Sequence, residues 1–165
     1  MKKILKAATV LLLAAVVVVS GNVFAYAQTQ TYEAYLYKDG TYGTDSAKLS
    51  MGNDAVLDAE VTTNSNGDYI IAIGFTPKFK AYGFTAGISE FTLEGYDCVT
   101  DTSVTADTLS AGQYYVTRDA NHAVILVTIN YGSVEPIYPL VLNTSFKVDV
   151  LLMNFTASAD IVITK

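Results

Sequence analysis

The sequence predicts an all-β chain, an immunoglobulin-like antiparallel β-sandwich that follows an N-terminal signal peptide. Two observations support this prediction. After residue 28 the chain is rich in Val, Ile, Thr, Tyr and Phe, and its apolar runs are short and separated by Gly, Asn, Asp or Ser. No segment keeps a helical period over three turns. Short strands with regular turns in a chain of this length are typical of a sandwich.

The first 27 residues have the pattern of a secretory signal peptide. A positively charged start, MKK and then Lys6, precedes the apolar run AATVLLLAAVVVV, and AYA before Gln28 is a small-x-small cleavage site. The alternative is an uncleaved membrane anchor, but the run breaks at Ser-Gly-Asn and is short for a span. We therefore expect residues 28–165 to form one domain that is secreted, without membrane insertion, and wall-associated only through a partner.

Charge and cysteine content exclude several classes of partner and site. From Gln28 onward, seven Lys plus Arg stand against sixteen Asp plus Glu, a net charge of −9. Such a chain has no basic surface for nucleic acid or for anionic membranes. The single cysteine, Cys98, excludes an intrachain disulfide framework and is expected to be a small buried hydrophobe. No cysteine follows the apolar run, so we expect no lipoprotein anchor.

Eight segments have the composition and length of strands, with turn residues between them. Asn66-Gly67 is the strongest hairpin signal, because both residues tolerate a positive φ. RDANHA is a second polar turn and places His122 at an exposed tip. Thr44–Gly52 is predicted to hold one helical turn, and VEPIYP a longer connection. The predicted strands are Thr31–Tyr37, Ala55–Thr62, Asp68–Phe75, Glu90–Glu94, Gln113–Thr117, Ala123–Asn130, Phe146–Leu152 and Ala159–Thr164.

The side-chain inventory argues against an enzyme. One His and one Cys cannot build a zinc site or a Cys/His pair within one chain. Glu90 and Glu94 lie four residues apart on a predicted strand, about 13 Å, which is too far for either glycosidase geometry. The remaining carboxylates are scattered without the spacing of a calcium loop. The chain is therefore predicted to bind a partner or ligand without catalysing a reaction.

The segment FKVDVLLMNF starts as a regular half-buried strand and then breaks its alternation. Phe146, Val148 and Val150 alternate with the polar Lys147 and Asp149. If the strand continued, the polar face would carry three large apolar side chains, Leu151, Met153 and Phe155. Exposing each of them would forgo ~1.5–3 kcal/mol of burial. We therefore expect a loop, a ligand or a partner protein to cover them.

Two methionines follow the signal peptide, and each has two possible roles. Met51 lies in the short turn KLSMGND, and Met153 lies at the end of the late strand. A thioether is a soft ligand for haem iron or copper(I), but methionine is also a common gap-filler in protein cores. The sequence pattern alone does not choose between these roles.

At these residues the sequence resembles a known family. The stretches GNDAVLDAEVTTNSNGDYIIAI and KVDVLLMNFTASADIVI look like the Shp-type haem-binding surface proteins of Gram-positive bacteria, relatives of the NEAT haem-transport domains. The resemblance spans most of the chain after residue 28 as an order of strands, but its literal motifs are short. It implies an immunoglobulin-like sandwich that holds haem between an early turn and the last hairpin, and a function in iron acquisition.

The same resemblance implies a set of site residues and partners. The haem iron would be ligated by Met51 and Met153. The Y-x-x-x-Y motif of ordinary NEAT domains is missing. A haem-relay surface protein or a transporter lipoprotein would exchange the cofactor with the chain. The pocket walls would be Leu49, Leu151 and Phe155, and the propionate partners Lys48 or Lys147.

Two other functions fit the same residues. A carbohydrate-binding or adhesive sandwich would use some of the twelve tyrosines as stacking platforms. A structural sandwich without a small ligand would pair with other chains through an edge strand. In either case Leu151, Met153 and Phe155 would lie under a loop or a partner.

Overall fold

The computed structural model describes residues 29–81, 83–150 and 153–165. They form ten strands and one 3₁₀ turn, and each of the eight predicted strands overlaps an observed strand. The predicted signal peptide, residues 1–27, lies outside the described residues. The elements are β1 (Gln30–Lys38), η1 (Asn53–Ala55), β2 (Val56–Thr63), β3 (Tyr69–Phe75), β4 (Phe79–Ala81), β5 (Phe84–Leu93), β6 (Asp97–Cys98), β7 (Gln113–Arg118), β8 (Val124–Gly132), β9 (Leu140–Val150) and β10 (Met153–Thr164).

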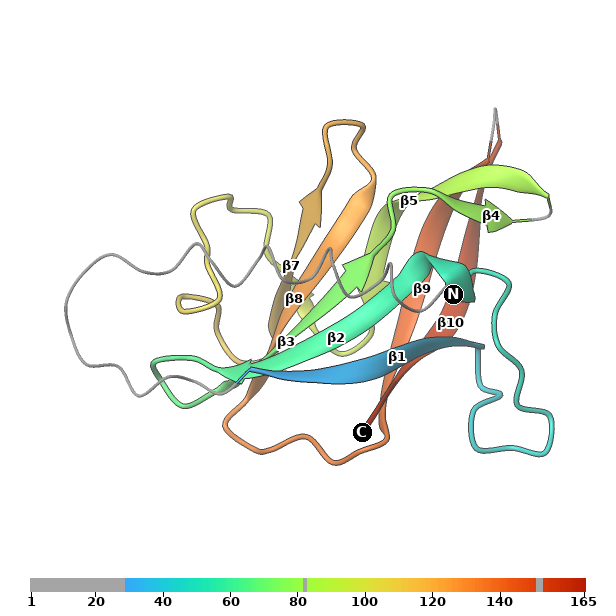
Figure 1. Ribbon diagram of the computed structural model, residues 1–165. Coiled ribbons are helices and arrows are strands. Elements are labelled where there is room, and N and C mark those ends of the chain that lie inside the picture. Colours follow the sequence, from blue (N-terminus) through green and yellow to red (C-terminus); the bar gives the residue numbers. More distant parts are fainter. Residues whose placement is uncertain (1–28, 82, 151–152) are drawn as a thin grey trace.

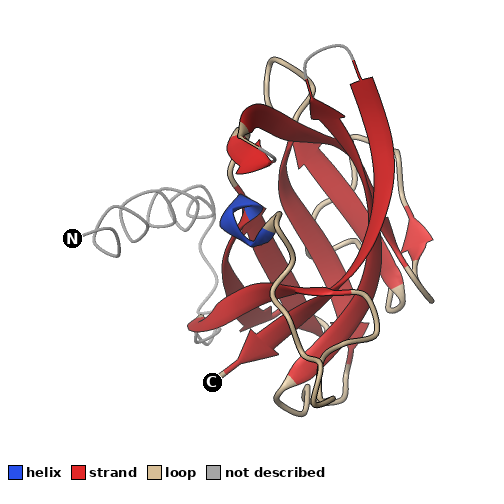
Figure 2. Ribbon diagram, turned by 90° about the vertical axis from the view of Figure 1, so that its right-hand side faces the viewer, coloured by secondary structure: helices blue, strands red, loops and turns tan. Residues whose placement is uncertain are grey.

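The ten strands form one continuous sheet that folds over into two layers, in the order β4-β5-β9-β10-β1-β2-β3-β8-β7-β6 (Figure 1). β1 joins the layers, because residues 30–32 pair with β2 and residues 33–38 pair with β10. The described pairings are antiparallel, apart from the two-residue β6 against β7. Figure 2 shows the layers from the side, with η1 next to the strands. The predicted antiparallel sandwich is confirmed.

Aromatic rings from both layers meet in the core. Phe91 of β5 lies 5.9 Å from Phe75, 5.4 Å from Phe146 and 5.8 Å from Tyr114, measured between ring centroids. The Tyr114 hydroxyl donates to the Phe91 carbonyl at 3.4 Å and accepts from the Leu93 amide at 3.4 Å. Burial raises the pKa of Tyr114 to about 12, so the hydroxyl stays protonated at neutral pH. The core is thus both packed and hydrogen-bonded across the two layers.

The Asn-Gly hairpin is present between β2 and β3, with a different turn from the predicted one. Gly67 has a φ of 86°, but Asn66 is not among the residues with positive φ. Instead Asn64 holds the loop, since its side-chain oxygen accepts from the amides of Asn66 (3.0 Å) and Asp68 (2.9 Å). The glycine alone therefore supplies the left-handed conformation, as in a hairpin with a bulge.

Other local predictions have mixed outcomes. His122 is exposed at the β7–β8 turn as predicted, with a φ of 64°. The connection containing Pro136 separates β8 from β9 as predicted. The helical turn was predicted too early, because η1 begins at Asn53, after the segment assigned to it. Cys98 was predicted to be buried and is exposed on β6, which lies at the edge of the sheet. Within the described residues, no helix is long and apolar enough to cross a membrane.

The broken alternation in FKVDVLLMNF marks a hairpin and not an irregular strand. β9 ends at Val150 and β10 begins at Met153, and the two strands pair along their whole length. Met153 lies opposite Val150 and Phe155 opposite Val148, and directly opposed residues of an antiparallel pair share a face. The prediction that Met153 and Phe155 continue the face of Lys147 is therefore wrong, because the chain reverses between them.

Candidate functional site

A row of side chains crosses four strands at the end of the sandwich that contains the β9–β10 hairpin. Phe79 of β4 pairs with Ala86 of β5, which pairs with Val150 of β9, which pairs with Met153 of β10. Because each pair is directly opposed, all four side chains point to the same face, which we call the inner face. The first three are buried, at 7%, 2% and 4% exposed, whereas Met153 is 71% exposed.

Exposure on the inner face of β10 decreases steadily along the strand. Met153 is 71% exposed, Phe155 is 38% exposed, and Ala159 and Ile161 are 2% and 0% exposed. The two layers therefore cover the second half of β10 and leave its beginning open to solvent. We call this margin of the inner face, next to the β9–β10 hairpin, the open end. Apolar groups there are accessible to a ligand without unfolding of the core.

Met51 lies in a turn that is fixed to β1 next to the same row. The Leu36 carbonyl accepts from the Ser50 amide at 2.7 Å, and the Leu36 amide donates to the side-chain oxygen of Asn53 at 2.8 Å. A methyl group on Gly52 would lie 3.4 Å from Leu36 and 3.8 Å from the ring of Phe79. The turn thus packs against the residue that begins the row, and Met51 itself is 57% exposed.

Leu49 does not line the inner face. It forms an isolated antiparallel bridge with Tyr37. One hydrogen bond flanks this pair on each side: the Lys38 amide donates to the Lys48 carbonyl, and the Ser50 amide donates to the Leu36 carbonyl. A pair placed in this way has its side chains close together on one side of the strands. Tyr37 alternates with the core residue Leu36, so Leu49 lies on the outer side. Its predicted role as a pocket wall is not supported by this placement.

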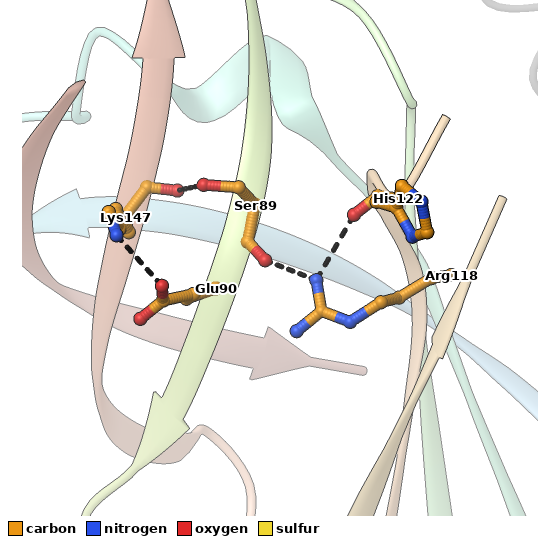
Figure 3. Close-up of polar contacts among 5 residues, drawn as sticks. All are labelled: Ser89, Glu90, Arg118, His122 and Lys147. Carbon is orange, nitrogen blue, oxygen red and sulfur yellow. Dashed lines mark hydrogen bonds and ion pairs between the residues drawn. The ribbon is translucent and has the colours of Figure 1, made fainter. Parts of the chain in front are cut away.

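The two predicted propionate partners occupy different environments. Lys48 is exposed in the loop next to Leu49. Lys147 lies on the outer face of β9, opposite Thr156, and its ammonium pairs with Glu90 at 2.9 Å (Figure 3). That hydrogen bond and the Glu90 charge raise the pKa of Lys147. Because the sheet separates Lys147 from Met153, the structure does not bring these two residues together.

Of the predicted site residues, the structure brings Met153 and Phe155 onto one face and places the Met51 turn against the same row. Leu151 lies outside the described residues. Sequence reasoning missed two aromatic residues of this region, Phe79 and Phe84. The signal was present as the alternation in KFKAYGF, but β4 has only three residues and resembles a loop in sequence.

Described residues also form three surface clefts, one of which shares Ala86 with the row. The largest, about 360 Å³, is lined by Tyr96, Tyr131 and Leu142 among others. A cleft of about 240 Å³ lies between β5 and the β7–β8 turn and includes His122. A third, of about 170 Å³, includes Tyr138. Neither methionine lines any of the three, and the described residues contain no cluster of three His, Cys, Asp or Glu side chains that could hold a metal ion.

Comparison with known proteins gives two similar solved structures. One is the NEAT5 domain of IsdX2, a B. anthracis hemophore, in complex with heme, at 18% identity and a TM-score of 0.43, covering 84% of this chain and 94% of that chain. The other is a mutant of IsdX2-NEAT5 in complex with heme, at 19% identity and a TM-score of 0.47, covering 84% and 93%. No family model and no curated protein matches. Both solved structures are NEAT domains in complex with heme.

Proposed function

We propose that this chain is a secreted haem-binding protein, without enzymatic activity, and that Met51 and Met153 are the axial ligands of the haem iron. The observation that carries the proposal is the exposure of both methionine residues, 57% for Met51 and 71% for Met153. A methionine that fills a core gap is buried, whereas a ligand needs an accessible sulfur. Among the described residues, these two methionines lie in elements that flank one cross-strand row, which begins at Phe79.

The surroundings of the two sulfurs suit a flat apolar cofactor. Met153 and Phe155 project from the inner face where the layers no longer cover it, and a bound ring system would remove this apolar area from water. Lys48 is the proposed propionate partner, because Lys147 lies across the sheet and pairs with Glu90. Haem would supply the iron that both sulfurs ligate, and the chain would supply the apolar contacts that orient it.

The proposed role is capture and relay outside the cell. Two neutral thioethers hold haem iron without a fixed negative charge, which favours a carrier that must release its cargo. The predicted signal peptide would bring the chain to the extracellular side, where it would exchange haem with another haem-relay surface protein or a transporter lipoprotein. The acidic surface, with a net charge of −9 after residue 27, is unsuited to nucleic acid.

A haemin titration of residues 28–165, followed by the visible spectrum, tests this function. We expect stoichiometric binding with a Soret shift that changes or disappears in Met51→Ala and Met153→Ala. Lys48→Ala should weaken binding, and Lys147→Ala should not. The control is Ile137→Ala, which removes an 83% exposed apolar side chain from the β8–β9 connection. Binding that none of the methionine variants alters would disprove the ligand assignment, and absence of binding would disprove the function.

Carbohydrate binding is a second candidate, and one observation favours it. Tyr35 and Tyr37 lie on the outer side of β1 and are partly exposed, and the Tyr37 ring packs edge-on against Tyr42 at 4.9 Å. Glu33 accepts a hydrogen bond from the Tyr35 hydroxyl at 2.6 Å, which raises the pKa of Tyr35. Rings beside a carboxylate are suited to stacking on sugars. Retention on a polysaccharide column that is lost in Tyr37→Ala, without haemin binding, would favour this candidate.

A further inference from the structure

Phe84 is a large apolar side chain at the open end that belongs to neither the early turn nor the last hairpin. It begins β5 and pairs with Ala81 of β4. It is two residues from Ala86, so it shares the inner face with both alanines, which are 5% and 2% exposed. Thr85 points the other way and accepts a hydrogen bond from the Lys80 ammonium at 3.0 Å. Phe84 is nevertheless 51% exposed.

The exposure of Phe84 sets it apart from most phenylalanines of the chain. Six phenylalanines lie in the described residues, and four of them are at most 7% exposed. The other two are Phe84 and Phe155, at 51% and 38%. By the strand register, both point to the inner face at the end that also carries Met153. Leaving two aromatic rings on one margin of the core loses burial energy, which favours a functional reason for their position.

The spacing of these residues indicates the shape of the occupant. Phe84 and Met153 are separated by two strand spacings and by two residues along the strand, which gives about 12 Å between Cα atoms. A small apolar molecule would contact one side or the other, whereas a flat multi-ring ligand can contact both. The β4–β5 hairpin therefore provides a third side of the open end, in addition to the Met51 turn and β10.

We propose that Phe84 packs against the porphyrin ring and that this contact is independent of the metal, so that the site accepts porphyrins as a class. The proposal rests on the proposed function, because the position of the ligand is inferred from the two methionines. Ligation by the methionine sulfurs requires iron, whereas an aromatic side chain packs against a ring with or without a metal. Ring packing and iron ligation should therefore be separable by mutation.

The experiment compares haemin with metal-free protoporphyrin IX on the same proteins, by absorbance and by fluorescence quenching. If the ligand buries the exposed half of the Phe84 side chain, Phe84→Ala should lower the affinity for both ligands by a similar factor, about 4- to 12-fold. The Soret maximum of the haemin complex should stay in place in this variant. Met153→Ala should weaken haemin binding by a larger factor than protoporphyrin IX binding, because only haemin also loses an iron ligand. The affinity of Phe84→Leu, which keeps an apolar side chain, should lie between those of Phe84→Ala and the wild type for both ligands.

The outcomes distinguish a failure of the Phe84 contact from a failure of haem binding. Equal affinities of Phe84→Ala and wild type for both ligands would overturn the role of Phe84 and leave haem binding intact. A loss confined to haemin would also overturn it, because the contact would then depend on the metal. Weakened binding in Phe84→Ala with no effect of the methionine variants would overturn iron ligation and support Phe84. A wild type that binds neither ligand would overturn both proposals. The exposed Ile137→Ala is the control for the loss of an apolar side chain.

Discussion

The stability of methionine variants in the ligand-free protein distinguishes a core filler from a site residue. Met153 is 71% exposed, so less than a third of its surface is shielded from water. Full burial of a methionine side chain contributes ~1.5–3 kcal/mol, and a third of that is about 0.5–1 kcal/mol. We therefore expect Met153→Ala to lower the free energy of unfolding by about 0.5–1 kcal/mol, and Met51→Ala, at 57% exposed, by about 1 kcal/mol.

The matched control is Ile161→Ala on the same strand and the same face. Ile161 is fully buried, and truncation of a buried isoleucine costs about 2–5 kcal/mol. Urea unfolding followed by circular dichroism measures all three variants, with an unchanged slope against denaturant as the sign of two-state behaviour. If Met153→Ala cost as much as Ile161→Ala, the sulfur would be a core group and the ligand assignment would fail.

Three further predictions concern the contacts around the β5 and β7–β8 region. Arg118 donates hydrogen bonds to the carbonyls of Ser89 and of His122 in the β7–β8 turn and so links the two layers (Figure 3). Arg118→Ala should therefore lower the unfolding free energy by about 1–2 kcal/mol, and Arg118→Lys by less, as measured by urea unfolding. Backbone amides of the turn donate to Asp119 and lower its pKa, so its contribution to stability is present at neutral pH and lost as the pH falls below about 4. Urea unfolding at several pH values should show that the difference in unfolding free energy between wild type and Asp119→Asn shrinks below that pH. Glu90→Gln removes an exposed pair with Lys147 and should leave the midpoint of thermal unfolding nearly unchanged, because solvent screens such a pair. A clear drop in the melting temperature would contradict the placement of that pair in solvent.

Local patterns in the sequence determined the fold class and most of the strands. Alternation along β1 and the first half of FKVDVLLMNF correctly separates buried from exposed side chains, because successive residues of a strand point to opposite faces. The Asn-Gly hairpin was also predictable from local sequence, because Gly67 takes the positive φ that the turn needs. These features depend on neighbours in sequence. They could therefore be derived without knowing which strands meet.

The tertiary structure decided which residues meet at the open end. The two residues between Val150 and Met153 are leucines, without the Gly, Asn or Pro that would mark a chain reversal there, so the sequence suggested one continuous strand. Only the register of β9 with β10 shows that Met153 and Phe155 share the inner face. Only the pairing of β4 with β5 adds Phe84 to that face. Register between strands depends on the packing of distant segments, so local alternation predicts the faces of each strand but not which faces are joined.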